Sequence, residues 1–122
     1  LKAGMDAVRK KSVTQSELLI QGIERELVPL GFSLASPLDS DQRGSHVTLR
    51  HSDAYRINRA MIAPAANQKV IIPDFRPPDL IRLGISPLYN SFSDIYNTVE
   101  RLKEIVLSKE YENFDDNQLK VP

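Results

Sequence analysis

Cysteine is missing from the 122-residue sequence, and its absence excludes several kinds of chemistry together. Disulfide bonds, zinc sites with cysteine ligands, iron–sulfur clusters and a cysteine nucleophile all require this residue. The sequence also lacks any apolar run close to the roughly 20 residues of a transmembrane helix. No apolar segment follows a basic start at the N-terminus, as it would in a signal peptide. We therefore expect a cytoplasmic protein that does not bind a membrane.

An excess of one charge is missing as well, because 16 lysines and arginines balance 16 aspartates and glutamates. A nucleic-acid-binding protein would show a basic excess, so we expect no such partner. Gly44 and Gly84 stand alone, and no glycine-rich loop of the kind that cradles phosphates is present. What remains is an ordinary globular composition, 41% hydrophobic and 26% charged, in a chain long enough for one domain with its own core.

Hydrophobic periodicity predicts seven elements in the order α-β-β-α-β-β-α. They are a helix over residues 6–28, strands over 32–36 and 45–50, a helix over 55–62, strands over 70–72 and 80–86, and a helix beginning after Ser91. These elements predict an α+β fold, a two-layer sandwich in which helices cover one face of a short four-stranded antiparallel or mixed sheet. We place the domain at residues 1–110 and a polar tail at 111–122.

Local signals mark the ends of several of these elements. Gly31 suits the left-handed position that ends the first helix. Ser52 is a candidate N-cap for the second helix. Ser91 and Asp94 predict a capping box at the start of the last helix.

Only two histidines are present, His46 and His51. Their odd separation puts them on opposite faces of one continuous strand, so they cannot bind one metal ion unless the strand bends. No HExxH helix is present either. Ser45 and His46 point apart as strand neighbours, and a serine-hydrolase elbow is absent. We predict neither a metal site nor a catalytic residue in this chain.

Arg82 is the strongest candidate for a binding residue. It lies in the strand predicted over residues 80–86, whose apolar face carries Ile81, Leu83 and Ile85 and should pack on the helices. Arg82 lies on the opposite face beside Gly84 and Ser86, which leave room above its guanidinium. A planar, permanently charged fork in such a place suits bidentate binding of a carboxylate. The alternative is an arginine on an open sheet face that is solvated or ion-paired.

The segment that follows Arg82 resembles the C-terminal signature of class V pyridoxal-phosphate (PLP) enzymes of the aminotransferase fold. In that signature, an arginine on a strand precedes a Tyr-Asn-Ser/Thr segment, which opens an acidic-capped helix; here this segment is Tyr89-Asn90-Ser91. Nearly the whole chain further resembles the kynureninase family. The matching stretches are GMDAVRKKS (residues 4–12), RGSHVTLRH (43–51), YRINRA (55–60), PDFRPPD (73–79) and PLYNSF (87–92). The connection over residues 64–69 departs from the family by being slightly longer than usual.

This resemblance implies the C-terminal small domain of a PLP enzyme of fold type I. Kynureninases are cytosolic homodimers that hydrolyse L-kynurenine or 3-hydroxykynurenine to anthranilate (or its 3-hydroxy form) and L-alanine in tryptophan catabolism, which supports NAD biosynthesis. In the family, the arginine that matches Arg82 binds the substrate α-carboxylate. The groups that bind PLP, including the Schiff-base lysine, belong to the large domain, and none matches a residue of this chain. Lys69 and Lys103 should not take that role. We therefore expect a fragment of a longer enzyme.

Two other interpretations stay open at this point. The chain could belong to another class V enzyme, such as a cysteine desulfurase-like or aminotransferase-like member. It could also be a free-standing α+β ligand-binding module without catalysis. The reading frame upstream of Leu1 separates the enzyme interpretations from the module, because an enzyme would need roughly 300 further codons that include a lysine at a strand end.

The first prediction concerns the isolated chain. We expect it to be catalytically inactive and not to bind PLP specifically, because the residues that hold the cofactor lie elsewhere. Titration with PLP, followed by absorbance in the Schiff-base band, checks this. A band that disappears when a single lysine of this chain is replaced would contradict it.

Overall fold

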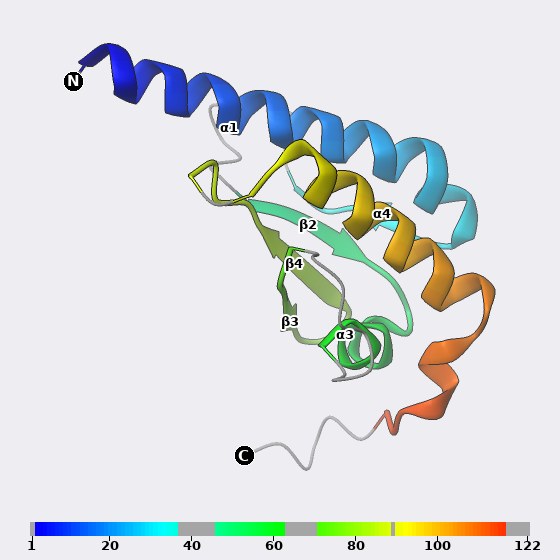
Figure 1. The fold of residues 1–122 in the computed structure, drawn as a ribbon. Helices are drawn as coiled ribbons and strands as arrows, with labels where there is room; N and C mark the ends of the chain where they lie inside the picture. Colours follow the sequence, from blue (N-terminus) through cyan, green and yellow to red (C-terminus); the bar gives the residue numbers. More distant parts are fainter. Residues whose placement is uncertain (1, 37–45, 63–70, 89, 117–122) are drawn as a thin grey trace.

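The computed structural model describes residues 2–36, 46–62, 71–88 and 90–116. Its elements are α1 (Lys2–Gly22), a π-helical turn η1 (Ile23–Leu27), a 3₁₀ turn η2 (Val28–Leu30), β1 (Ser33–Leu34), β2 (His46–Arg50), α3 (Ala54–Ile62), β3 (Pro73–Arg76), β4 (Leu80–Gly84), α4 (Phe92–Leu107) and a 3₁₀ turn η4 (Glu110–Asn113). The predicted α+β class is confirmed. Helices α1 and α4 lie side by side against the sheet (Figure 1).

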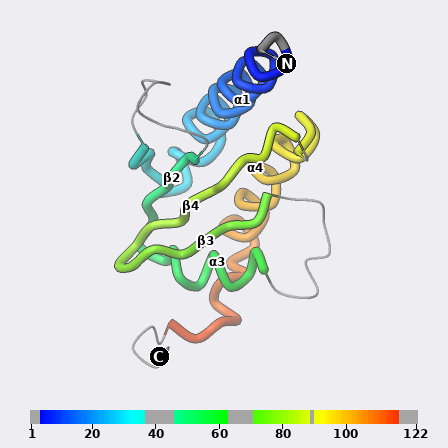
Figure 2. The backbone as a smooth tube through the Cα atoms, turned by 90° about the vertical axis from the view of Figure 1, so that its left-hand side faces the viewer, coloured from blue at the N-terminus to red at the C-terminus, as the bar shows by residue number. Residues whose placement is uncertain are grey.

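The sheet has the strand order β1-β2-β4-β3, and its neighbouring strands are all antiparallel. Figure 2 shows β2, β4 and β3 running next to one another. Side chains alternate between the faces of a strand, so one face of each strand enters the core. Val47, Leu49, Ile81 and Leu83 form that inner face and are fully buried. The predicted apolar face of the strand around Arg82 is therefore confirmed.

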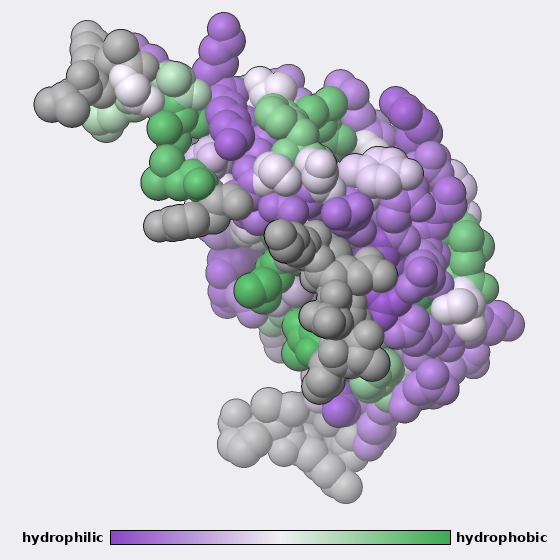
Figure 3. Space-filling view, in the orientation of Figure 1, coloured by the Kyte–Doolittle hydropathy of each residue, from purple (hydrophilic) through white to green (hydrophobic). Residues whose placement is uncertain are grey.

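The first helix differs from the prediction at both ends. It already includes Lys2, and its regular part stops at Gly22, after which η1 and η2 continue the turn to Leu30. Gly31 follows with φ +100°, the left-handed conformation that was expected of it. The apolar side chains in the first turns of the helix are not buried, and Met5 is 74% exposed. The N-terminal part of α1 extends past the sheet, and apolar surface shows there (Figure 3).

The strand predicted over residues 70–72 is wrong for Ile71 and Ile72; Val70 lies outside the described residues. Ile71 is buried, but its amide donates to the Thr98 hydroxyl of α4 at 2.9 Å and not to a strand. The strand lies at Pro73–Arg76 instead, between the two strands that were predicted in this region. It is an edge strand that pairs with β4 alone, and a proline is tolerated at the first position of such a strand.

Other boundaries are shorter than predicted. The strand over 32–36 is reduced to β1, and β4 ends at Gly84. The connections over 37–44 and 64–69 lie outside the described residues. In the predicted tail, Tyr111 and Phe114 pack against the core, and the Phe114 carbonyl accepts a hydrogen bond from Arg56 Nε at 3.0 Å. The domain limit at residue 110 stays a prediction.

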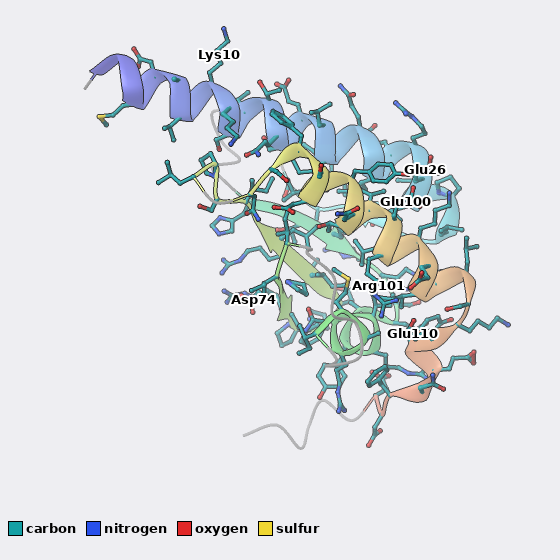
Figure 4. All side chains as sticks on the ribbon, in the orientation of Figure 1. Lys10, Glu26, Asp74, Glu100, Arg101 and Glu110 are labelled. Atoms are coloured by element: carbon teal, nitrogen blue, oxygen red, sulfur yellow. The ribbon has the colours of Figure 1, made fainter. Side chains whose placement is uncertain are left out.

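Helix α4 begins with the predicted capping box. Ser91 Oγ accepts from the Asp94 amide, and the Asp94 carboxylate accepts from the Ser91 amide. Later in α4, the buried Arg101 donates to Glu110 Oε2 at 2.6 Å, which fastens η4 to the helix (Figure 4). This hydrogen bond raises the pKa of the Arg101 guanidinium.

His51 joins the end of β2 to α3. Its Nδ1 accepts from the Asp53 amide at 2.9 Å, and its ring hydrogen-bonds the backbone of Leu30. The N-cap position belongs to Asp53 and not to Ser52, because the Asp53 carbonyl accepts the first helical bond, from Ile57. Since Nδ1 accepts, the neutral ring carries its proton on Nε2. Burial disfavours the charged ring and lowers the pKa of His51.

The second prediction follows from this lowered pKa. The unfolded chain takes up a proton on His51 near pH 6.5, whereas the folded chain resists it, so folding stability is complete above pH 6.5 and falls as the pH decreases below that value. The slope from this group cannot exceed about 1.4 kcal/mol per pH unit. Urea unfolding of this chain between pH 7.5 and 5.5 measures it. His51→Asn should flatten the slope, and His46→Asn, at the exposed histidine, should keep it.

Candidate functional site

The sheet face opposite the buried side chains carries Arg82. Arg82 lies in the middle of β4, directly between Thr48 of β2 and Asp74 of β3 in the antiparallel register. Directly paired residues in an antiparallel sheet share a face, so these three side chains are neighbours. Figure 4 shows Asp74 on the side of the sheet away from α4. The Arg82 side chain is 37% exposed, so it is partly held by its surroundings and partly open to solvent.

Arg82 and Asp74 form an ion pair that includes a second arginine. Arg82 Nη2 lies 3.2 Å from Asp74 Oδ2, and Arg76 Nη2 lies 2.8 Å from the same oxygen. Two arginines thus share one carboxylate, which leaves the group with a net charge of one positive unit. The local excess is notable because the whole chain is neutral.

The guanidinium of Arg82 keeps unused hydrogen-bond donors. Gly84, two residues along the same face, lies opposite His46, and the His46 ring covers it closely: a side-chain carbon added to Gly84 would be in ordinary van der Waals contact with that ring, at 3.5 Å. A guanidinium has five N–H donors, of which the Asp74 contact uses one. The remaining donors and the net positive charge make this face suited to a carboxylate. The sequence left open whether Arg82 is ion-paired or a binding residue, and the structure shows a pair that does not exhaust the donors.

Asp74 and Arg76 were not predicted as partners of Arg82. The sequence places Asp74 eight residues before Arg82, and only a hairpin that turns over Pro77–Asp79 brings them together. The predicted strand over 70–72 ends before Asp74 and therefore does not contain this register. An edge strand over PDFR, with alternating charged residues on one face, is the signal that could have revealed it.

Among the described residues, the signature segment that follows β4 fixes the turn that leads into α4. Asn90 Oδ1 accepts from the Ser86 amide at 2.9 Å, and Asn90 Nδ2 donates to Asp94 at 3.2 Å, which fixes the turn before α4. The buried Gln15 of α1 donates to the Asn90 carbonyl at 2.9 Å. These bonds set the direction in which the chain leaves the strand of Arg82. Tyr89 lies outside the described residues.

The two histidines do not meet. His46 is exposed on the face of Arg82, while His51 is buried beyond the end of β2 against Phe32, with the ring centres 4.6 Å apart. Among the described residues, no group of three or more histidine, aspartate or glutamate side chains is arranged to hold a metal ion.

The described residues of the helix layer border two hollows that lie away from Arg82. One of about 250 Å³ runs between α1 and α4 and is bordered by Leu18, Gly22, Tyr96 and Val99. The other, of about 210 Å³, lies along α4 near Lys103.

The described lysines do not fit a PLP site. Lys10 and Lys11 lie in α1, Lys103 in α4 and Lys109 just beyond it, all in the helix layer and not on the face of Arg82. A Schiff-base lysine needs a lowered pKa. The pKa of Lys103 is instead raised, first by its hydrogen bond to Glu26. Lys69 lies outside the described residues.

None of the helices among the described residues has both the length and the apolar character needed to cross a bilayer.

Comparison with known proteins identifies the family. The kynureninase C-terminal domain matches residues 8–102. Kynureninase from Bacillus mycoides (strain KBAB4) is 36% identical over 117 residues, which cover 96% of this chain and 26% of the relative. Kynureninases from Geobacillus thermodenitrificans (strain NG80-2) and Shouchella clausii (strain KSM-K16) are 34% and 35% identical over the same length, with the same coverage.

The chain therefore spans about a quarter of the length of these curated relatives. Of the three interpretations that the sequence left open, the match supports the first. The described elements from β2 to β4, with Arg82 among them, lie inside the matched region, and α4 begins within it. This chain belongs to the kynureninase family and corresponds to the C-terminal domain of its members.

Proposed function

We propose that this chain is the C-terminal domain of a PLP-dependent kynureninase, in which Arg82 binds the α-carboxylate of L-kynurenine or 3-hydroxykynurenine. The observation that carries the proposal is the partly exposed side chain of Arg82, whose guanidinium keeps unused donors on a sheet face with a net positive charge. The family membership supports the substrate class, because the relatives are named kynureninases.

In this proposal, the whole enzyme hydrolyses the Cβ–Cγ bond of kynurenine and releases L-alanine together with anthranilate, or 3-hydroxyanthranilate from the hydroxylated substrate. PLP, held by the remainder of the protein, supplies the electron sink for this chemistry. Arg82 contributes orientation: a carboxylate held by two parallel N–H groups cannot rotate freely, and this determines which bond of the α-carbon faces the cofactor. The homodimer and the cytoplasmic location expected from the resemblance are part of the same proposal.

A binding role for Arg82 also agrees with the small contribution that its ion pair with Asp74 makes to folding stability. Arg82 and Asp74 are 37% and 52% exposed, and ion pairs at such positions add little to folding stability. The core beneath them is apolar and fully buried at Ile81 and Leu83. We therefore expect the domain to fold without an arginine at this position, so that a replacement of Arg82 reports on function.

The third prediction tests this role in the full-length enzyme loaded with PLP. Arg82→Ala should raise KM for L-kynurenine and lower kcat/KM by roughly two to three orders of magnitude, because two charge-assisted hydrogen bonds are lost. Arg82→Lys should also be impaired, because an ammonium group cannot reproduce the fork. PLP content should stay unchanged. Anthranilate fluorescence measures the rates.

Arg50→Ala is the matched control. Arg50 lies on the same sheet face and also contacts an aspartate, with its Nε 3.4 Å from Asp79 Oδ1. Its loss should leave KM near the wild-type value. Near-normal kinetics of Arg82→Ala would remove the site assignment. Turnover of L-cysteine in place of kynurenine would remove the proposed reaction.

A further inference from the structure

We propose that Asp74 is a positioning residue that aligns the Arg82 guanidinium for the substrate carboxylate, and that Arg76 holds Asp74 in place. The inference rests on the proposed function of Arg82 and extends it by two residues on β3. Its basis is the three-membered arrangement on the open sheet face, in which Asp74 Oδ2 lies between the Nη2 atoms of both arginines.

The first step concerns the freedom of Arg82. An arginine side chain has many rotamers, and a half-exposed one must be ordered when a ligand binds, which weakens binding. Asp74 lies directly opposite Arg82 in the strand register, and its carboxylate accepts from Nη2. This contact fixes one end of the guanidinium before the ligand arrives. The donors that remain keep a defined direction.

The second step concerns charge. A lone aspartate beside Arg82 would neutralise it and would compete with the substrate carboxylate. Arg76 prevents this, because its Nη2 is the nearer partner of the same oxygen, at 2.8 Å against 3.2 Å for Arg82. With two arginines and one carboxylate, one positive charge is left for the ligand. Arg76 thus lets Asp74 hold Arg82 without cancelling its charge.

The third step concerns the backbone that carries these groups. Asp74 and Arg76 share a face of β3 because they are two residues apart, and the hairpin to β4 sets Arg76 opposite Leu80 and Asp74 opposite Arg82. Phe75 points the other way and packs against the core, with its ring 5.1 Å from that of Tyr55 in α3. The core contact of Phe75 keeps the two charged side chains on the substrate face.

In the fourth prediction, electrostatic attraction and positioning by Asp74 lead to opposite changes in KM when Asp74 is removed. Removal of Asp74 raises the local charge, so electrostatic attraction alone would tighten carboxylate binding and lower KM. If Asp74 positions Arg82, then Asp74→Ala and Asp74→Asn in the full-length enzyme raise KM for L-kynurenine by about tenfold or more, with kcat changed less than KM. Asp74→Glu, which keeps the carboxylate, recovers part of the loss. Arg76→Ala raises KM in the same direction.

A substrate analogue separates positioning from general damage. L-kynurenine amide carries a neutral carboxamide in place of the carboxylate, so its inhibition constant should not change in Asp74→Ala. The double variant Asp74→Ala/Arg82→Ala should resemble Arg82→Ala alone, because Asp74 acts through Arg82. Glu26→Gln is the matched control: Glu26 accepts from Lys103 Nζ at 3.1 Å in the helix layer, and its loss should leave KM unchanged.

The outcomes are distinct. An unchanged or lowered KM in Asp74→Ala, with Arg82→Ala strongly impaired, overturns the positioning role and keeps the proposed function. Equal rises in KM and in the inhibition constant of the amide indicate structural damage and also overturn it. A normal Arg82→Ala overturns the proposed function, and this inference with it. Normal kinetics of Arg76→Ala remove Arg76 from the arrangement.

Discussion

The alternation of side chains along β4 is the constraint on which the rest of this domain depends. Ile81 and Leu83 are fully buried under the helices, and the residue between them must therefore face away from the core. A shift of the strand by one residue would bury a guanidinium and expose two large apolar side chains, which is energetically prohibitive. The same hydrophobic contacts that fold the sheet thus hold Arg82 on its outer surface.

The antiparallel partners of β4 give that surface its chemistry. On one side, β2 places Thr48 next to Arg82 and His46 next to Gly84; on the other, β3 supplies the Asp74 carboxylate. Each strand is anchored from below, β2 by Val47 and Leu49 and β3 by Phe75. A charged face built this way is rigid because its supports are core residues. This rigidity suits the role that we propose for Arg82, which is to orient an amino acid.

The helix layer has a different role. The bond from Gln15 to the Asn90 carbonyl and the capping box of Ser91 fix the path from β4 into α4, and His51 links β2 to the turn at Leu30. These contacts determine where the strands lie relative to α1. The first turns of α1, in contrast, extend past the sheet with Met5 exposed, so the amphipathic pattern of this segment is not satisfied within the domain.

The sequence by itself determined the features that depend on neighbours along the chain. Period-two alternation predicted which face of β4 is buried, Gly31 predicted the left-handed end of the first helical region, and Ser91 with Asp94 predicted the capping box. Only the tertiary structure decided that β3 begins at Pro73 and sets Asp74 opposite Arg82, that His51 hydrogen-bonds the backbone of Leu30, and that Met5 is left uncovered. The physical reason is that a turn, a cap or an alternation is set by local conformational energies. The pairing of strands and the burial of a helix face depend on contacts between segments that only the folded core brings together.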